Sequence, residues 1–500
     1  MITNHSYLDN PTFRGMRWHL MRTFDEIYVL DLHGNSLKKE RCPDGSPDQN
    51  VFDIQQGVAI AFFIKSAKEN NEQACVHHAD LWGSQEEKYA WLSEHDWKCT
   101  PWQKIHPGPE FYLFIPTEEK EFKRYNTFPK VTDIFPVYSV GIVTARDRLT
   151  IRWTPEEVWT TVLNFSRMDP ELAREAYGLG KDARDWKVSL AQEDLRKSGP
   201  DRKHIVPILY RPFDVRYTYY TGRSRGFICM PRPEVMRHML AGENVALIVP
   251  KQHKEEFGAF ITRNVGAHKT VAAYDINYYF PLYLYPETER DDLFSKHEPS
   301  ERQPNLNAEL VRKLAEAYGE EPSPEDVFHY VYAVLYAPSY REKYAEFLRI
   351  DFPRIPFASD HELFRKMAKL GKRLVDLHLL RSPELDPPIA KFQGEGDGKI
   401  GTGKKGLRYD PESERVYINE TQYFEGVPPE VWEYQIGGYQ VCHKWLKDRR
   451  NRDKGLSADE IRTYCRIVTA LAQTIEIQEH IDKTFLHEGL ISEEGRDHGN

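Results

Sequence analysis

The spacing of apolar residues changes twice along this 500-residue chain, and that change limits the folds open to it. Near the start the spacing is helical from Pro11 to Phe24, alternating from Glu26 to Leu32 and continuous from Val58 to Ile64. A helix, a strand, a polar loop and a buried strand in that order are typical of one end of a doubly wound α/β sheet. We therefore expect residues 1–70 to form the truncated C-terminal half of such a Rossmann-like sheet, whose glycine-rich first turn would lie upstream.

Residues 71–300 predict a mixed, β-rich domain. Short runs of Tyr, Phe, Val and Ile are separated there by Pro and Gly, a pattern typical of short strands joined by turns. One amphipathic stretch, Pro155 to Phe165, predicts a helix. The expected strands are Glu110 to Ile115, Val140 to Thr144, His204 to Tyr210, Val215 to Tyr220 and Asn244 to Val249.

Residues 301–500 predict a mainly helical part. Ser323 followed by Pro324 and Asp326 is a helix-start pattern, because a serine hydroxyl can cap free backbone amides and proline suits the first helical position. The chain as a whole therefore predicts an α/β part followed by an α+β part. Further elements are expected as helices at Glu362 to Leu380 and Ala458 to Phe485, a Gly- and Lys-rich loop at Gly394 to Gly406, and strands within Leu407 to Tyr423.

The composition excludes several classes of protein. Five hundred residues, 40% of them hydrophobic, exceed what one core accommodates, so we expect two or three packed units. The longest apolar run, Val58 to Ile64, is far shorter than the roughly 20 residues that cross a bilayer, so we expect a cytoplasmic protein with no membrane contact. Six cysteines without close pairing indicate reduced thiols and no structural metal, namely Cys42, Cys75, Cys99, Cys229, Cys442 and Cys465.

The net charge of −9 argues against a uniformly basic nucleic-acid binder, so a DNA footprint would need local basic patches. Residues 202–269 hold twelve basic residues against five acidic ones, an excess of seven. The twelve are Arg202, Lys203, Arg211, Arg216, Arg223, Arg225, Arg232, Arg237, Lys251, Lys254, Arg263 and Lys269. A second patch contains Lys444, Lys447, Arg449, Arg450, Arg452 and Lys454 against Asp448 and Asp453.

Tyr210 to Phe227 is the richest stretch, because arginines there alternate with tyrosines. Guanidinium groups grip phosphate or guanine, and tyrosine offers stacking and a hydroxyl. Equally open is a structural alternative in which Phe213 and alternate tyrosines are core and Arg211 pairs with Asp214. The DNA-contact candidates from both patches are Arg211, Arg216, Tyr219, Tyr220, Arg223, Arg225, Lys444, Lys447, Arg449 and Arg450.

Catalytic patterns are weak throughout the sequence. Asn10 to Phe13 resembles the polar-Pro-Pro-aromatic turn that grips a flipped base, but Thr12 replaces the second proline and the stretch suits a helix start. Asp386 to Ile389 lacks the aromatic residue and predicts a turn. His77 and His78 would point to opposite faces of a strand, which disfavours a shared metal. We therefore expect no catalytic and no metal-binding residue.

Several stretches resemble a known family of enzymes. The opening ones resemble the late motifs of amino-methyltransferases, above all those of single-chain type ISP restriction-modification enzymes, and the later ones resemble the C-terminal specificity region of the same enzymes. The resemblance covers the whole chain. It is carried by Ile2 to Asp9, Asp31 to Asn35, Asn50 to Ile54 and Gly57 to Ile60, then by Tyr210 to Asp214, Phe280 to Tyr285 and Gly437 to Trp445.

Type ISP enzymes are built as nuclease, helicase-like motor, methyltransferase and target-recognition domain, and this chain resembles the last part. The resemblance implies that residues 1 to about 66 complete an adenine N6 methyltransferase sheet and that the remainder, 71–300 and 301–500, reads a short site in double-stranded DNA. S-adenosylmethionine would bind only with an upstream methyltransferase and motor polypeptide, so no catalytic residue is carried over. The alternative is a stand-alone, non-catalytic DNA-binding remnant or modulator.

Overall fold

The computed structural model describes residues 1–36, 40–66, 73–109, 111–116, 119–286, 302–450 and 452–487. They form two compact units, Met1–Thr127 and Phe128–Asn500. The domain boundaries predicted near residues 70 and 300 stay predictions. In the described ranges, no helix combines the length and the apolar character that a bilayer crossing requires.

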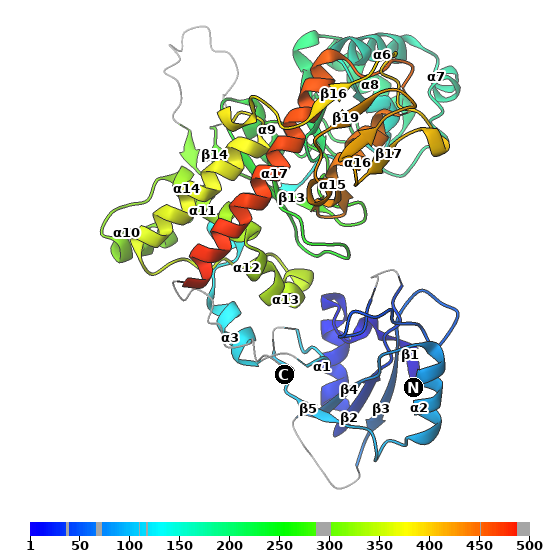
Figure 1. Ribbon diagram of the computed structural model, residues 1–500, viewed down its shortest axis with the longest axis vertical. Helices are drawn as coiled ribbons and strands as arrows, with labels where there is room; N and C mark the ends of the chain where they lie inside the picture. The colour runs from blue at the N-terminus through cyan, green and yellow to red at the C-terminus, as the bar shows by residue number, and fades with distance from the viewer. Residues whose placement is uncertain are drawn as a thin grey trace. The chain divides into compact units, whose positions relative to one another are not determined.

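The first unit is built on a five-stranded sheet in the order β1-β3-β2-β4-β5, in which β1, β2 and β4 run parallel and β3 and β5 run against them. Helices α1 and α2 lie on opposite sides of this sheet (Figure 1). The strands are β1 (Ile2–Asn4), β2 (Glu26–Asp31), β3 (Val58–Ile64), β4 (Cys75–Asp80) and β5 (Gln103–Ile105), and the helices are α1 (Arg14–Thr23), α2 (Gln85–Glu94) and α3 (Glu119–Thr127).

Most of the elements expected near the start are confirmed. A short 3-10 helix, Pro11–Phe13, and α1 replace the predicted single helix, and β2 and β3 match their predictions. The strand predicted at Glu110 to Ile115 is wrong over residues 111–115, and Glu110 lies outside the described residues. Phe114 is fully buried there, and its amide donates to the carbonyl of Leu8 at 2.9 Å, but residues 111–116 form turns and bends. Burial of aromatic side chains, rather than strand pairing, produced that pattern.

The second unit begins with two four-stranded sheets, β11-β10-β13-β6 and β12-β8-β9-β7. Helices α6 and α8 pack on β9 around the fully buried Trp186. The predicted strands are confirmed at β8, β9 and β10. The strand predicted at Val140 to Thr144 overlaps β6 only at Val140, and Ile142 and Val143 form isolated bridges. The strands are β6 (Ser139–Val140), β7 (Ile151–Arg152), β8 (Ile205–Arg211), β9 (Asp214–Tyr219), β10 (Ala246–Pro250), β11 (Phe260–Thr262), β12 (Val265–Gly266), β13 (Asn277–Pro281), β14 (Tyr283–Leu284) and β15 (Gln303–Pro304).

Helix α4 precedes the strands of these two sheets in the sequence, and helices α5 to α9 lie between them. The helices are α4 (Val131–Ile134), α5 (Asp147–Thr150), α6 (Pro155–Arg167), α7 (Pro170–Ala176), α8 (Val188–Ser198) and α9 (Pro233–Leu240). The helix predicted at Pro155 to Phe165 is therefore confirmed as α6, where Thr154 caps the first turn through its hydroxyl. Pro155 occupies the first helical position, which suits a residue without a backbone N–H.

Three long helices, α11, α14 and α17, lie side by side in the last part of the chain (Figure 1). As predicted, α11 begins after Ser323, whose hydroxyl accepts the amide of Asp326 at 3.1 Å. The helices are α10 (Ala308–Tyr318), α11 (Pro324–Tyr336), α12 (Pro338–Lys343), α13 (Ala345–Ile350), α14 (His361–His378), α15 (Pro429–Glu433), α16 (Val441–Arg449) and α17 (Ala458–His487).

A small antiparallel sheet, β16-β19-β18-β17, packs against α17. It confirms the strands predicted after the Gly- and Lys-rich loop. Its core face includes Val416 and Phe424, which are fully buried, and Tyr464 of α17 lies 4.4 Å from Phe424 between ring centroids. The strands are β16 (Lys391–Gln393), β17 (Arg408–Asp410), β18 (Arg415–Tyr417) and β19 (Tyr423–Glu425), followed by the pair β20 (Gln435–Ile436) and β21 (Tyr439–Gln440).

The close approach of α11 and α14 depends on Gly371. A Cβ at this position would collide with the carbonyl oxygen of His329 in α11. We predict that Gly371→Ala lowers the free energy of unfolding of the second unit by about 1–3 kcal/mol, the usual cost of overpacking. Gly15→Ala is the matched control, because Gly15 is a helical glycine with open space around it. It should stabilise α1 by up to about 1 kcal/mol. Urea unfolding of both variants tests this, and equal effects would contradict it.

Candidate nucleic-acid interface

The β8–β9 hairpin positions the arginine-rich stretch. Arg211 and Asp214 face each other across the ladder, which leaves Pro212 and Phe213 as the loop. Phe213 has a φ of 59°, an uncommon value for a bulky residue. Its ring is buried and lies 5.0 Å from the ring of Phe260 and 5.7 Å from His378 between centroids. The aromatic side chain therefore anchors the tip of the hairpin in the core and holds the strained turn in place.

Asp214 is the buried charge at the centre of this region. Its carboxylate is 1% exposed and accepts hydrogen bonds from Arg449 Nη2 at 2.9 Å and from Arg216 Nη2 at 2.7 Å. Burial alone would raise the pKa of this carboxyl, but the charges of Arg449 and Arg216 outweigh burial and hold the pKa below its usual range. The pairing of Arg211 with Asp214 in the structural alternative is therefore wrong, since the partners of Asp214 are Arg216 and Arg449.

Three guanidinium groups lie close to the ring of Trp153. The Cζ atoms of Arg216, Arg449 and Arg452 lie 3.9, 4.8 and 4.7 Å from its centroid. Glu460 of α17 accepts from Arg449 Nε at 3.1 Å and from Arg452 Nη1 at 2.7 Å. We call Trp153, Arg216, Arg449, Arg452, Asp214 and Glu460 the arginine–tryptophan cluster. It joins β9 to α16 and α17, so Arg216 and Arg449 serve the scaffold.

Three further candidates also point inward. Arg211 Nη1 donates to the carbonyl of Lys269 at 3.0 Å, and its guanidinium stacks on Tyr210. Tyr219 is fully buried in the core around Trp186 and accepts the amide of Asp201 at 3.1 Å. Tyr220 is also buried, donates to the carbonyl of Pro231, and has a pKa raised by burial. The structure places these side chains where they hold loops and strands together.

Arg223 and Arg225 differ, because their side chains are 50% and 65% exposed. Their loop folds around the buried carboxylate of Asp194, which accepts from Thr221 Oγ1 and from the amide of Phe227, both at 2.9 Å. Arg223 Nη1 lies 3.8 Å from Asp194, and Arg225 Nη2 lies 3.4 Å from Asp185. An inward carboxylate thus orders a loop that presents two guanidinium groups to solvent.

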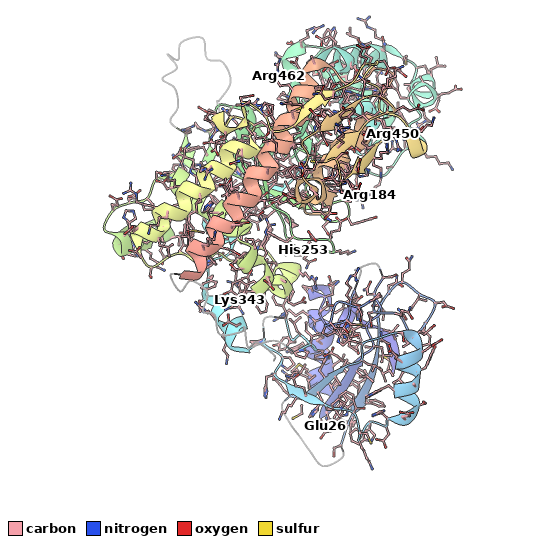
Figure 2. All side chains as sticks on the ribbon, viewed as in Figure 1. Glu26, Arg184, His253, Lys343, Arg450 and Arg462 are labelled. Atoms are coloured by element: carbon pink, nitrogen blue, oxygen red, sulfur yellow. The ribbon has the colours of Figure 1, made fainter. Side chains whose placement is uncertain are left out.

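The candidates on and next to α16 also differ in their exposure to solvent. Lys447 is exposed, and Lys444 pairs with Asp448 at 2.5 Å, one helical turn away. Arg450 follows the helix, is half-buried, and its Nε lies buried without a hydrogen-bond partner. Arg184 pairs with Asp185, and the Arg184 side chain is 88% exposed. Both Arg184 and Arg450 are labelled in Figure 2.

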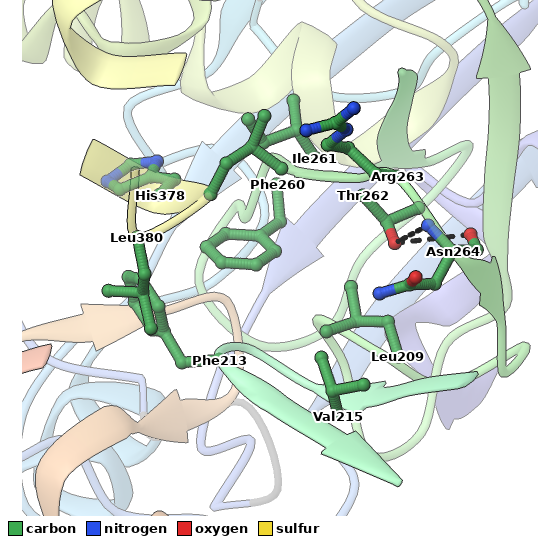
Figure 3. Close-up of a pocket in the computed structure, with 11 residues that line it drawn as sticks. Leu209, Phe213, Val215, Phe260, Ile261, Thr262, Arg263, Asn264, His378 and Leu380 are labelled. Carbon is green, nitrogen blue, oxygen red and sulfur yellow. Dashed lines mark hydrogen bonds between the residues drawn. The ribbon is translucent and has the colours of Figure 1, made fainter. Parts of the chain in front are cut away.

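An open pocket of about 450 Å³ lies beside the hairpin (Figure 3). His378 contributes no acid or base there, because burial and the charge of Arg341 lower its pKa to about 3 and both ring nitrogens are hydrogen-bonded, to Tyr332 and Thr474. The pocket also has polar lining side chains, Thr262, Arg263 and Asn264. It is lined by Leu209, Phe213, Val215, Phe260, Ile261, Thr262, Arg263, Asn264, His378, Leu379 and Leu380.

Sequence reasoning missed Trp153, Arg452 and Glu460 as members of the cluster. Glu460 carries a local signal, since its backbone amide bonds to the hydroxyl of Ser457 as in a helix start. Trp153 carries none, because it lies outside both basic patches and meets the arginines only through the tertiary fold.

Comparison with known proteins agrees with the resemblance seen in the sequence. The family described as the Type ISP C-terminal specificity domain matches residues 133–480. No curated protein matches the chain.

The solved structures that share its fold include three with DNA or a DNA substrate mimic. They are a DrdV–DNA complex (24% identity, TM-score 0.69), the ATP-dependent Type ISP restriction-modification enzyme LlaBIII bound to DNA (21%, 0.69), and a nuclease-deletion mutant of the Type ISP enzyme LlaGI with a DNA substrate mimic (20%, 0.67). Each similarity covers 96% of this chain. The chain spans only 50%, 32% and 46% of those three chains, respectively.

We predict that Asp214→Asn destabilises the second unit by about 3–5 kcal/mol, because it leaves Arg449 and Arg216 buried without their counter-charge. Glu193→Gln is the control, since Glu193 forms a solvent-exposed pair with Lys197 and should change stability by less than about 0.5 kcal/mol. Urea unfolding followed by tryptophan fluorescence measures both. Equal losses would contradict a dominant role for the buried pair.

The same pair predicts a pH dependence. The pKa of Asp214 is lowered in the folded state, so the ionised carboxylate stabilises the fold fully above its unfolded pKa of about 3.9. This contribution to the free energy of unfolding is lost as the pH falls through the folded-state pKa. The difference in unfolding free energy between the wild type and Asp214→Asn should be constant from pH 5 to 7 and narrow below about pH 4. A difference that stays constant into the acid range would argue against an ionised Asp214.

Proposed function

The chain belongs to the Type ISP C-terminal specificity domain family, and from this premise we propose that it recognises a site in duplex DNA for a restriction-modification enzyme. The single observation that carries the proposal is the family match over residues 133–480, which covers most of the second unit. Two of the similar solved structures are described as bound to DNA or in a DNA complex, and the third holds a DNA substrate mimic.

The charge distribution of the second unit supports contact with a nucleic-acid backbone. Arg223 and Arg225 are the most exposed of the arginines proposed for DNA contact, and their loop is folded before any ligand arrives. A guanidinium held in this way can bind phosphate without a large cost in ordering the loop. We propose that Arg223 and Arg225 bind the DNA backbone together with Lys447 and Arg450. The inward-pointing candidates hold the underlying strands and helices in place, and Lys444 pairs with Asp448 on α16. These inward-pointing residues are Arg211, Arg216, Tyr219, Tyr220 and Arg449.

We further propose that the first unit serves an adenine N6 methyltransferase with S-adenosylmethionine as the methyl donor, in company with a methyltransferase and motor polypeptide. The residues described here do not themselves fit the donor. Where β2 ends, the amide of Gly34 donates to Asp48 and the side chains of Asp31 and His33 are hydrogen-bonded within the protein. We therefore assign no donor contact and no transfer step to this chain.

Replacement of Arg223 and Arg225 by alanine tests the proposal. The double variant should bind a mixed-sequence duplex more weakly, and the slope of log affinity against log salt should fall by nearly two, since each lost phosphate contact is worth about 0.9. Fluorescence anisotropy across a salt series gives both quantities.

Arg312→Ala with Lys313→Ala is the matched control, because both residues lie on the exposed face of α10 in ordinary helical ion pairs. It removes the same charge and should leave the slope unchanged. If both double variants weaken binding equally, the effect is one of net charge and the loop has no special role. If the wild type binds no duplex even at low salt, the proposed function itself fails.

A further inference from the structure

Ionisable side chains gather at one edge of the sheet in the first unit. The parallel strands β1, β2 and β4 lead at this edge to His5, Asp31 with His33, and Asp80. Ligands of open α/β sheets bind outside the carboxyl ends of the strands, which is this edge. No spacing in the sequence predicted this grouping, because the residues follow three separate strands.

His5 is held in one orientation by a carboxylate. The side chain is 5% exposed, and its Nδ1 lies 3.0 and 3.2 Å from the two carboxylate oxygens of Asp31. Its Nε2 lies 3.3 Å from the side-chain amide nitrogen of Asn35, a donor. If Nδ1 donates to Asp31, the Nε2 lone pair accepts from Asn35 in this structure, and a metal bound to Nε2 would take the place of that amide.

His33 repeats this arrangement with the opposite ring nitrogen. Its Nε2 lies 2.8 Å from Asp80 Oδ1, and its ring stacks on Trp82. Its Nδ1 is buried without a hydrogen-bond partner, at 3.6 Å from Glu40 Oε1 and 3.8 Å from Asp31 Oδ2. A buried ring nitrogen that faces two carboxylates without a hydrogen bond needs either a proton or a cation.

One ligand atom from each of His5, His33 and Glu40 lies within 4.8 Å of the others. We propose that these three residues bind a borderline divalent transition-metal cation of the zinc class, with Asp31 and Asp80 orienting the histidines. Two imidazoles and one carboxylate are a common donor set for such cations, and histidine ligands usually donate their other nitrogen to a carboxylate. Magnesium and calcium prefer oxygen ligands alone.

The carboxylates around the two histidines agree with this assignment. Asp31 lies within hydrogen-bond distance of His5 Nδ1, Asp80 lies within hydrogen-bond distance of His33 Nε2, and Glu40 Oε1 lies 3.6 Å from His33 Nδ1. His78 Nε2 also lies 3.0 Å from Asp80 Oδ1. A divalent cation held by the three ligands would offset the negative charge of these carboxylates.

The metal would fasten the segment between β2 and β3 to the sheet. Glu40 lies in this segment, and its carboxylate already accepts the amide of Asn35 at 2.7 Å. Gly57, at the other end of the segment, packs so closely on the ring of His5 that a Cβ would collide with it. Glu40 and Gly57 thus both lie close to His5, and a bound cation would link Glu40 to the two histidines.

Isothermal titration of the EDTA-treated, untagged full chain with zinc chloride tests the proposal. We expect one zinc ion per chain, loss of this binding in His33→Ala and Glu40→Gln, and a 10- to 100-fold weaker affinity in Asp80→Asn. Magnesium chloride should give no binding. His77→Asn is the matched control and should bind zinc normally, because His77 stacks on Tyr28 with ring centroids 4.4 Å apart and is not part of the metal-binding triad.

Absence of zinc binding by the wild type would overturn the proposal. So would equal affinity in Glu40→Gln, which keeps the size of the side chain and would show that zinc binds to other histidines. Thermal unfolding with and without zinc gives a second readout, since zinc should raise the midpoint of the wild type and of His77→Asn but leave that of Glu40→Gln unchanged. Neither experiment requires DNA, so failure here is separate from failure of DNA binding.

Discussion

The buried carboxylate of Asp214 is the constraint on which the second unit depends. It lies at the start of β9, directly after a turn whose Phe213 has a positive φ, and it accepts hydrogen bonds from arginines on β9 and α16. A charge so deeply buried is tolerated only with well-placed partners, so the hairpin and α16 must keep their relative positions. Glu460 extends the same network to α17 through Arg449. Asp214 and Glu460 together therefore hold β9 against α16 and α17, which lie far later in the sequence.

This network separates arginines that are internal from arginines that a ligand can reach, in a chain whose net charge is −9. Arg216, Arg449 and Arg452 are neutralised by acids and stacked on Trp153, so much of the local excess of arginine is internal. The arginines on the loop after β9 are exposed and only loosely paired. Two populations of arginine therefore exist within one stretch of sequence, one structural and one available to a ligand.

Local signals in the sequence predicted much of the fold. The cap at Ser323 and the β8 and β9 strands depend on residues within a few positions of one another, and all are confirmed. The strand predicted near Phe114 failed, because a buried aromatic residue gives the same local pattern with or without a partner strand. Local pattern shows that a side chain is buried but not which backbone pairs with it.

The candidate site was less predictable for the same reason. Arg449 and Asp214 lie 235 positions apart, and His5 and His33 meet through the packing of three strands, so neither grouping has a signature in sequence spacing. The stretch from Tyr210 to Phe227 was found because its composition is unusual. Its division into buried tyrosines and exposed arginines required the structure.

Chemical cross-linking of the chain to duplex DNA, followed by peptide mass spectrometry, measures the central claim most directly. The account predicts that cross-linked peptides come mainly from the second unit, with the loop around Arg223 and Arg225 and the exposed face of α16 among them. Cross-links found only in the first unit, or only at the buried arginine–tryptophan cluster, would contradict DNA contact by the exposed residues of the second unit.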